Sequence, residues 1–350
     1  HSAPALLQPG DRVRFHETND ADTAHDHSAA TSAECLTPKD LTILEPGLMT
    51  TVQDLGRSGF RSSGVPYSGV ADQISAVLAN SILGNPESAA VLEYTLLGPT
   101  LRFESDTFIA IAGATNTSIA GLRPIRVRRG ETVHLGHVAK GCRGYLAVAG
   151  GICVPPVLNS YSTFVPAKLG GYNGRPLQAG DQLSLGEPLV TSFSTNWCLS
   201  NTIAQLPSNP CTLRILPEGR ISAAHRAITS TPMNVTAQSD RMGIRFDGSL
   251  PSLPATSLSR AVLPGTIQLP PDGKPILLLC DAQTIGGYPV LGQVIAADLP
   301  RAAQLRPGDT VRFSETTLAE AHRLLRHQHD VLATVQQGIT RILGFAGKAE

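Results

Sequence analysis

The sequence is poor in charged and in aromatic residues. Charged residues occupy 16% of its 350 positions, and 28 basic side chains balance 28 acidic ones. A chain without net charge has no overall field that attracts nucleic acid or an anionic membrane surface. Aromatic residues make up 5%, which disfavours a surface that stacks on nucleic-acid bases. We therefore expect no nucleic-acid partner and no membrane partner.

Long apolar runs are absent too, since no stretch approaches the roughly 20 residues that span a bilayer. The sequence begins at His1 with no basic-then-apolar leader, so a secretory signal is not expected. No two cysteines form a C-x-x-C pair, which favours buried, reduced thiols over zinc ligands or disulfides. These features predict a cytoplasmic protein. The six cysteines are Cys35, Cys142, Cys153, Cys198, Cys211 and Cys280.

Several catalytic and cofactor motifs are also missing. The sequence has no G-K-[ST] phosphate loop, no G-x-S-x-G elbow, no H-E-x-x-H pair and no biotinyl A-M-K-M segment. His134 and His137 stand three positions apart without an evident third ligand. His25 and His27 lie in a polar stretch typical of a solvated linker. No metal site is expected.

What the sequence does have is many turns, with 33 glycines and 26 prolines, and a repeated phrase. P-G-D-R-V-R-F at 9–15 returns as P-G-D-T-V-R-F at 307–313, with weaker echoes at 130–133 and 179–183. Gly-Asp favours a tight turn, and the alternating residues after it enter a half-buried strand. The first copy is followed by the polar stretch 16–40, so residues 1–15 are expected to be the tail of a preceding, fused domain.

The rest of the sequence predicts a mainly β fold with few short helices. Residues 41–190 and 205–315 read as two successive barrel-type units built from short strands. A helix is predicted at 73–83, and another at 318–327 within a C-terminal helical tail, 316–350.

Polar residues among glycines mark the first candidate site, in residues 50–85. Asp54 and Arg57 either pair with one another or act on a ligand, with Arg57 as a planar fork for a carboxylate or phosphate and Asp54 as a proton acceptor. Glu93 lies in an apolar strand, so it needs a partner or a task. Residues 160–163 and 170–175 combine glycines, hydroxyls and an arginine, a pattern that suits an anion site and a run of tight turns equally well.

The second unit contains two further candidate segments. Residues 238–243 form a compact polar turn, and residues 281–289 place a Gly-Gly pair between Gln-Thr and Tyr-Pro. The latter is typical of a substrate loop between two strands.

Ten of these segments, in order over residues 41–315, resemble the allophanate hydrolase subunit 2 family, which includes KipA, the C subunit of 5-oxoprolinase and the carboxyltransferase region of urea carboxylase. The resemblance implies cyclophilin-like β-barrel units, and it identifies residues 1–15 with the end of the KipI-like subunit 1. The matching segments are T-T-V-Q-D-L-G-R-S-G (50–59), G-V-P-Y-S-G-V-A-D-Q-I-S (64–75), A-N-S-I-L-G-N (79–85), L-E-Y-T-L-L-G-P (92–99), Y-L-A-V-A-G-G (145–151), S-Y-S-T (160–163), G-G-Y-N-G-R-P-L (170–177), S-D-R-M-G (239–243), G-T-I-Q (265–268) and Q-T-I-G-G-Y-P (283–289).

The sequence departs from the family pattern at four places. Family members usually have Gly-Pro-Gln where this chain has 217–220, a Tyr where Ile244 stands, a Thr where Ile285 stands and an Arg where Tyr161 stands. An arginine and a threonine are thus missing from candidate anion-binding positions.

The function implied by the resemblance is that of a component of an ATP-dependent amidohydrolase acting on cyclic amide C–N bonds, such as 5-oxoprolinase. ATP would be used by the whole complex, whose other members are a KipI-like subunit 1 and an A-type lactam-utilisation subunit, and the substrate would be a small-molecule amide. Two alternatives stay open: a carboxyltransferase that uses carboxybiotin and urea or another amide, and a KipA-like regulatory protein without catalysis.

The candidate residues are divided into catalytic and substrate-binding residues. Arg57, Arg175 and Arg241 are the candidates for anion or phosphate charge, while Gln283 and Tyr288 are expected to hold the amide. The predicted catalytic residues are Asp54, Arg57, Glu93, Asp240 and Arg241. The predicted substrate-binding residues are Ser68, Asn80, Ser162, Gly171, Arg175, Gln283, Thr284, Gly287 and Tyr288.

Overall fold

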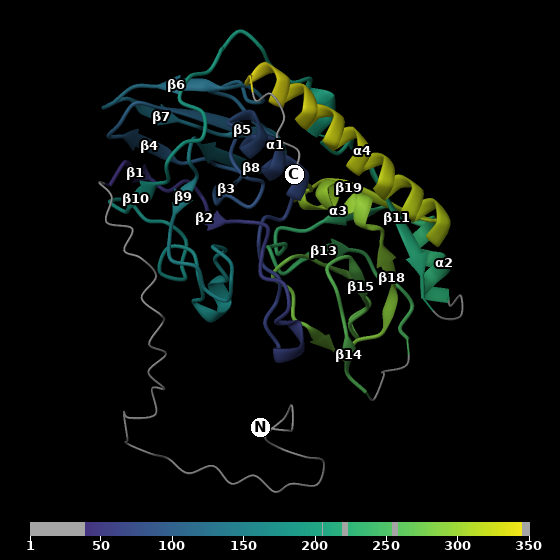
Figure 1. Cartoon of the computed structure of the whole chain (residues 1–350). Helices are drawn as coiled ribbons and strands as arrows, with labels where there is room; N and C mark the ends of the chain where they lie inside the picture. Colours follow the sequence, from purple (N-terminus) through teal and green to yellow (C-terminus); the bar gives the residue numbers. More distant parts are fainter. Residues whose placement is uncertain (1–38, 205, 219–222, 254–257, 345–350) are drawn as a thin grey trace, which may run out of the picture. The chain divides into compact units, whose positions relative to one another are not determined.

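The computed structural model describes residues 39–204, 206–218, 223–253 and 258–344 (Figure 1). The predicted tail 1–15 and nearly all of the predicted linker 16–40 lie outside these residues. The described part is mainly β, as the sequence predicts.

The first half consists of two antiparallel five-stranded sheets that share one core. Leu41 and Phe103 of one sheet and Leu92 and Leu146 of the other belong to the same buried cluster. The first sheet has the order β7 (Thr132–His134), β4 (Thr100–Phe103), β1 (Leu41–Glu45), β10 (Gln182–Leu185) and β9 (Ile152–Cys153). The second has the order β2 (Thr50–Gln53), β3 (Val91–Thr95), β8 (Val138–Val148), β5 (Thr107–Asn116) and β6 (Ile125–Val127).

The second half closes into a barrel. Its first and last strands lie side by side in parallel, with Leu213 opposite Phe313, and this pair joins the two edges of the sheet. A separate cluster of apolar side chains, which includes both residues, fills the interior. The strand order is β11 (Cys211–Pro217), β18 (Val290–Val294), β15 (Thr266–Gln268), β16 (Ile276–Leu278), β13 (Gly243–Asp247), β12 (Met233–Val235) and β19 (Thr310–Glu315).

Short elements complete the described chain. Strands β14 (Arg260–Ala261) and β17 (Ile285–Gly286) pair in a separate two-stranded antiparallel sheet. The shorter helices are η2 (Arg61–Ser63), η3 (Val165–Ala167), η4 (Asn201–Ala204), α2 (Ala223–Ser230), η5 (Ala296–Asp298) and α3 (Leu299–Ala303).

The Gly-Asp and Gly-Glu phrases form the turns that the sequence predicts. Gly130, Gly180 and Gly308 have φ values of 80°, 89° and 90°, and the strand begins two positions after each of them. The following acidic side chain accepts a hydrogen bond from the backbone three residues earlier, as between Asp309 and the Arg306 amide at 3.0 Å. These turns need glycine because the left-handed conformation is costly for other residues.

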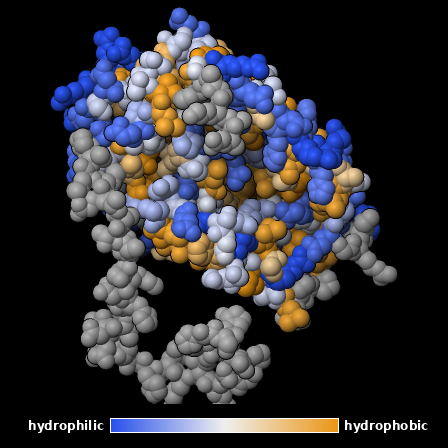
Figure 2. All heavy atoms as spheres, in the orientation of Figure 1, coloured by the Kyte–Doolittle hydropathy of each residue, from blue (hydrophilic) through white to orange (hydrophobic). Residues whose placement is uncertain are grey.

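Both predicted helices form, but the second is longer than expected. Helix α1 (Gln73–Ile82) begins at Asp72, whose side chain accepts from the Ser75 amide at 3.1 Å. Helix α4 runs over Leu318–Ile342, so the predicted end at 327 is wrong. The reason is that its apolar stripe continues to Ile339, which packs in a cluster with α1 and the outer face of the β5–β8 sheet. Figure 2 shows hydrophilic and hydrophobic side chains interspersed on the face in view.

The cysteines only partly follow expectation. Cys142 and Cys211 are buried, and Cys153 and Cys280 are partly exposed. Cys198 is exposed, which corrects the prediction of a buried thiol. Its neighbours Trp197 and Leu199 turn towards the β5–β8 cluster instead, and Cys198 lines an open cavity beside β5. None of the helices in the described ranges is long and apolar enough to cross a membrane.

Candidate functional site

Several predicted catalytic residues meet where the first half contacts the barrel. Arg241, in the loop before β13, donates from Nε and Nη2 to the Asp281 carboxylate at 2.8 and 3.0 Å. Its Nη2 also donates to the Gly69 carbonyl at 2.6 Å, and its Nη1 donates to Glu93 on β3. Glu93 accepts a further bond from the Ala71 amide at 2.9 Å. The buried carboxylate predicted to need a partner therefore has one, on the other half of the molecule.

The charged side chains of this network stabilise one another in their ionised forms. Burial alone would raise the pKa of Glu93, but the guanidinium groups of Arg241 and Arg143 outweigh it and leave that pKa below its usual value. Burial acts to lower the pKa of Arg241, whereas Asp281 and Glu93 raise it well above the ordinary value. Both side chains therefore stay charged. With its donors taken by protein acceptors, Arg241 serves as a structural anchor, and its predicted catalytic role stays a prediction.

Arg143 and Gln304 lie next to this network, and the sequence analysis predicted neither of them as a site residue. Arg143 on β8 is 4% exposed, and it donates to the carbonyls of Ala303 and Asp240. Gln304 accepts from the Arg143 amide at 3.0 Å and donates to Asp72 at 2.8 Å. The signal that singled out Glu93, a charged residue in an apolar strand, applies equally to Arg143 in residues 138–149.

Asp54 organises a second cluster beside the first. Its carboxylate accepts from the Ser160 hydroxyl at 2.7 Å, from the Tyr161 amide at 2.7 Å, from the Gly56 amide at 2.8 Å and from the Ser162 hydroxyl. Ser162 in turn accepts from the Asp54 amide at 3.0 Å. The predicted residues Asp54 and Ser162 are thus in contact, and Asp54 fixes the 160–162 segment against residues 54–56.

Arg57 lies fully buried next to this cluster. Its Nη2 donates to the Ser162 carbonyl, while Nε and Nη1 have no partner among the described residues. Burial lowers its pKa, and the charges of Asp54 and Asp281 oppose that shift. Gly170 is required here because a Cβ would lie 2.5 Å from the Arg57 Nη2. Unpaired buried donors are rare, so Arg57 is where a water or a ligand acceptor is needed.

Ser68 connects this cluster to the barrel. It has a left-handed backbone with φ 51°, and its amide donates to the Cys280 carbonyl at 3.0 Å. Its hydroxyl is buried without a partner in the described chain. A non-glycine residue in this conformation is uncommon and is typical of functional segments.

The remaining residues of the first half lie apart from these clusters or have structural contacts. Asn80 holds the end of α1 by donating to the Ala89 carbonyl at 2.8 Å. Arg175 forms a two-pronged bond to Asp181 at 2.7 and 2.9 Å. Gly171 packs so closely on Thr163 that a Cβ would lie 1.8 Å from its hydroxyl. For residues 170–175 the structure thus shows close turns with a paired arginine.

Asp240 has a local role. Its carboxylate accepts from the amides of Met242 and Gly243 at 2.7 and 3.1 Å and closes the turn that carries Arg241. It therefore positions Arg241, and it is exposed rather than enclosed in the network.

The predicted substrate loop lines a cavity of 550 Å³ on the barrel, which contains Gln283, Gly287 and Tyr288. Thr284 lies beside it, buried, with its carbonyl accepting from the Val262 amide at 3.0 Å. Gln268 of β15 also lines this cavity, and the site prediction did not include it. Its position in the matched G-T-I-Q segment was the available signal.

Gln268 has an incomplete hydrogen-bond set. It is 1% exposed, and its Oε1 accepts from Gln283 Nε2 at 3.1 Å. Its own Nε2 has no partner among the described residues. Gly286 leaves room for this amide, because a Cβ there would lie 2.3 Å from Nε2.

No group of three or more metal-ligating side chains occurs in the part of the chain that the structure describes. His134 instead contacts the Thr100 hydroxyl through Nδ1 at 2.7 Å.

Comparison with known proteins identifies a matching family and several similar proteins. Residues 63–315 match the family model described as carboxyltransferase domain, subdomain A and B. The chain is similar to the C subunit of 5-oxoprolinase from Haemophilus influenzae, with 36% identity over 307 residues, 84% of this chain and 97% of that protein. The C subunit of Escherichia coli 5-oxoprolinase is 37% identical over 82% of this chain and 95% of its own length.

Larger proteins contain a similar region. The urea amidolyase of Saccharomyces cerevisiae is 33% identical over 84% of this chain, but that region is 17% of its length. Among solved structures, Kluyveromyces lactis urea carboxylase superposes with a TM-score of 0.76 and 31% identity over 86% of this chain and 30% of that one. The K. lactis urea amidolyase gives a TM-score of 0.75 and 32% identity over 84% of this chain and 20% of that one. The chain therefore spans under a third of these two structures.

Proposed function

The chain belongs to the carboxyltransferase domain family, subdomain A and B, and from this we propose that it is the component of a 5-oxoprolinase that corresponds to the C subunit. In this proposal the enzyme opens 5-oxoproline to glutamate at the expense of ATP, together with partner subunits. The proposal draws on the extent of the similarity. Two relatives named as the C subunit of 5-oxoprolinase correspond to this chain over 97% and 95% of their lengths. The proposed partners are a KipI-like subunit 1 and an A-type lactam-utilisation subunit.

The observation that carries the proposal is the unpaired amide of Gln268 in the wall of the barrel cavity. A buried N–H without an acceptor costs free energy, and the carbonyl oxygen of a small amide would satisfy it. Gln283 fixes the orientation of Gln268 through its own hydrogen bond. We propose that the lactam binds here, with its oxygen on Gln268 Nε2 and its ring edge towards Tyr288.

The chemistry of a lactam explains what such a pocket contributes. A five-membered lactam is a poor electrophile, and a donor aimed at its oxygen draws electron density from the carbonyl carbon. ATP, when bound, supplies the phosphoryl group that makes this oxygen a leaving group. The pocket's own task is to hold and orient the amide for that activation.

In this proposal the nucleotide step is not assigned to the arginines that the sequence assigned to phosphate. Arg241 is bonded to two carboxylates and a carbonyl, and Arg175 is bonded to Asp181. Arg57 is fully buried, with its Nη2 bonded to the Ser162 carbonyl and its Nε and Nη1 unpaired among the described residues. The anion-binding role of these three residues stays a prediction.

A second candidate function is carboxyl transfer from carboxybiotin to urea or another amide, which the similarity to urea carboxylase favours. The same amide pocket would then hold the acceptor. The biotinyl carrier and its carboxylase would have to be supplied by other chains, since the sequence has no A-M-K-M segment.

The test is 5-oxoproline-dependent ATP hydrolysis by the full parent protein combined with its lactam-utilisation type partner. Gln268→Leu keeps the side-chain volume and removes the donor, so we expect a loss of turnover of roughly tenfold or more. Gln337→Leu, on the exposed side of α4, is the matched control and should retain wild-type turnover.

Three outcomes separate the candidates. No turnover by the complete assembly, or equal turnover by the wild type and Gln268→Leu, would contradict the proposal. Urea-dependent ATP hydrolysis that also requires bicarbonate and a biotinylated carrier would favour carboxyl transfer instead.

A further inference from the structure

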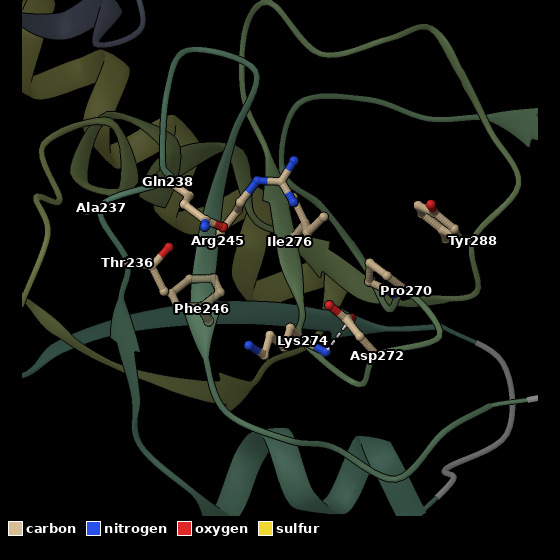
Figure 3. A pocket seen from close by; sticks show the side chains of 10 residues that line it. All are labelled: Thr236, Ala237, Gln238, Arg245, Phe246, Pro270, Asp272, Lys274, Ile276 and Tyr288. Atoms are coloured by element: carbon tan, nitrogen blue, oxygen red, sulfur yellow. Dashed lines mark hydrogen bonds between the residues drawn. The ribbon is translucent and has the colours of Figure 1, made fainter.

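A second cavity, of 530 Å³, lies next to the amide pocket on the outer face of the barrel (Figure 3). Its walls come from the segment between β12 and β13, from β13, and from the turn between β15 and β16. Tyr288 lines both cavities. None of the residues that distinguish this second cavity is a predicted site residue.

Strand register fixes the relation between the two cavities. Ile276 of β16 lies opposite Gln268 of β15 on one side and opposite Arg245 of β13 on the other. Arg245 and Gln268 are therefore two strand spacings apart, about 10 Å. Lys274 precedes β16 by two residues and lines the same cavity as Arg245. The basic residues thus stand beside the amide pocket, with Arg245 two strands away from Gln268.

The second cavity carries a net positive charge. Arg245 and Lys274 are exposed, and neither charged end takes part in a hydrogen bond or ion pair within the described ranges. Asp272 is the one acidic side chain among the described residues that line this cavity, so its charge offsets one of the two cations. Its carboxylate accepts from the Lys274 backbone amide at 3.0 Å, as drawn in Figure 3.

Thr236 provides a donor that lacks a partner. Its hydroxyl oxygen is buried and has no hydrogen bond among the described residues, while its amide donates to the Arg245 carbonyl at 2.9 Å. A buried hydroxyl is normally paired, so this atom points to an absent acceptor. Two cations and a hydroxyl around one cavity match the oxygens of a phosphoryl group.

The other walls suit a flat ring. Phe246, Ile276 and Pro270 form apolar surface, and Tyr288 is 46% exposed at the edge shared with the amide pocket. An exposed aromatic face is a surface on which a heterocycle can stack.

We propose that this cavity binds a phosphoryl group on Arg245, Lys274 and Thr236, and that its source is a nucleotide whose ring lies against Tyr288. The inference deepens the proposed function. It rests on that function, because it takes the neighbouring cavity to be the site of the amide substrate. Nucleotide binding can be measured without turnover. The nucleotide proposal can therefore fail while 5-oxoproline-dependent activity is retained, and nucleotide binding can be found in a protein that does not turn over 5-oxoproline.

The experiment is calorimetric titration of the full chain with ADP, with inorganic phosphate and with adenosine. We expect ADP to bind, and Arg245→Gln and Lys274→Gln each to weaken it roughly tenfold or more, since each removes a charge-assisted contact. Arg312→Gln on β19, exposed and outside the cavity, should bind like the wild type. Phosphate that binds and competes with ADP would show that the free ion suffices, whereas ADP binding alone would identify the nucleotide as the source.

Thr236→Val separates binding from folding. Because the hydroxyl has no partner in the described part of the protein, its replacement by a methyl group should leave the thermal midpoint unchanged or higher, while ADP binding weakens several-fold. The proposal is overturned by the absence of ADP and phosphate binding, by adenosine binding as tightly as ADP, or by ADP binding equally well to wild type, Arg245→Gln and Lys274→Gln.

Discussion

Arg241 of the barrel donates to the carboxylate of Glu93, which lies 148 positions earlier in the chain on strand β3 of the first half. Both side chains are almost fully buried, and Asp281 and Arg143 complete the set of charges around them. Such a network holds two parts of a molecule in one geometry, because any displacement leaves a charge buried without its partner. Residues that looked catalytic in the sequence thereby align the two halves.

Glu93→Gln should therefore be strongly destabilising. The substitution removes one negative charge and leaves Arg241 and Arg143 undercompensated, which for a buried pair costs about 3–5 kcal/mol. Urea unfolding followed by circular dichroism measures the change in the free energy of unfolding. Glu320→Gln is the matched control, because Glu320 also pairs with an arginine, Arg323, but on the exposed face of α4. A loss for Glu93→Gln as small as for Glu320→Gln would show that the buried network contributes little.

The raised pKa of Asp72 predicts that the stability of the protein depends on pH. Burial raises its pKa to about 6, against the opposing hydrogen bonds from Ser75 and Gln304. In the unfolded chain an aspartate titrates near 3.9, so between about pH 4 and pH 6 the folded state holds a proton that the unfolded state has lost. Raising the pH through this window therefore lowers stability, and the penalty is absent below it.

Asp72→Asn should remove this dependence. Relative to the variant, the wild type should lose roughly 3 kcal/mol of unfolding free energy from about pH 4 to pH 7. Urea unfolding of both proteins across this range gives the difference, and Asp330→Asn on the exposed part of α4 serves as the reference. A wild-type-minus-variant difference that is flat with pH would contradict the raised pKa.

Arg175 is expected to act on stability and not on substrate. Its fork matches both oxygens of Asp181, a geometry that lysine cannot reproduce, so Arg175→Lys should cost roughly 1 kcal/mol. In the assay of the proposed function, 5-oxoproline turnover per folded molecule should stay within twofold or so of the wild type, because the guanidinium is already occupied. A tenfold rise in KM without loss of stability would restore the substrate-binding role that its sequence motif suggested.

The class of the fold, its tight turns and the start of its first helix could be predicted from local sequence. Gly-Asp turns, alternating strands and the start of α1 depend on neighbouring residues, so Gly180, Gly308 and Asp72 could be interpreted without a structure. The order of the motifs also pointed to the family that the comparisons show. The end of α4 was set too early, although the apolar stripe continues beyond 327 at Leu332, Val335 and Ile339 with helical spacing. The sequence therefore already contained the signal for the longer helix.

Which polar side chains already have hydrogen-bond partners became clear from the folded structure. Arg175 and Arg241 look alike as arginines beside glycines, yet one pairs six positions away and the other across the junction with Glu93 and Asp281. The converse holds for Gln268 Nε2 and the Thr236 hydroxyl, which are buried atoms without a partner among the described residues. The G-T-I-Q segment marked Gln268 as a matched position, but it did not indicate an unpaired donor. Hydrogen-bond satisfaction depends on burial and on partners far along the chain, and neither is encoded in local sequence pattern.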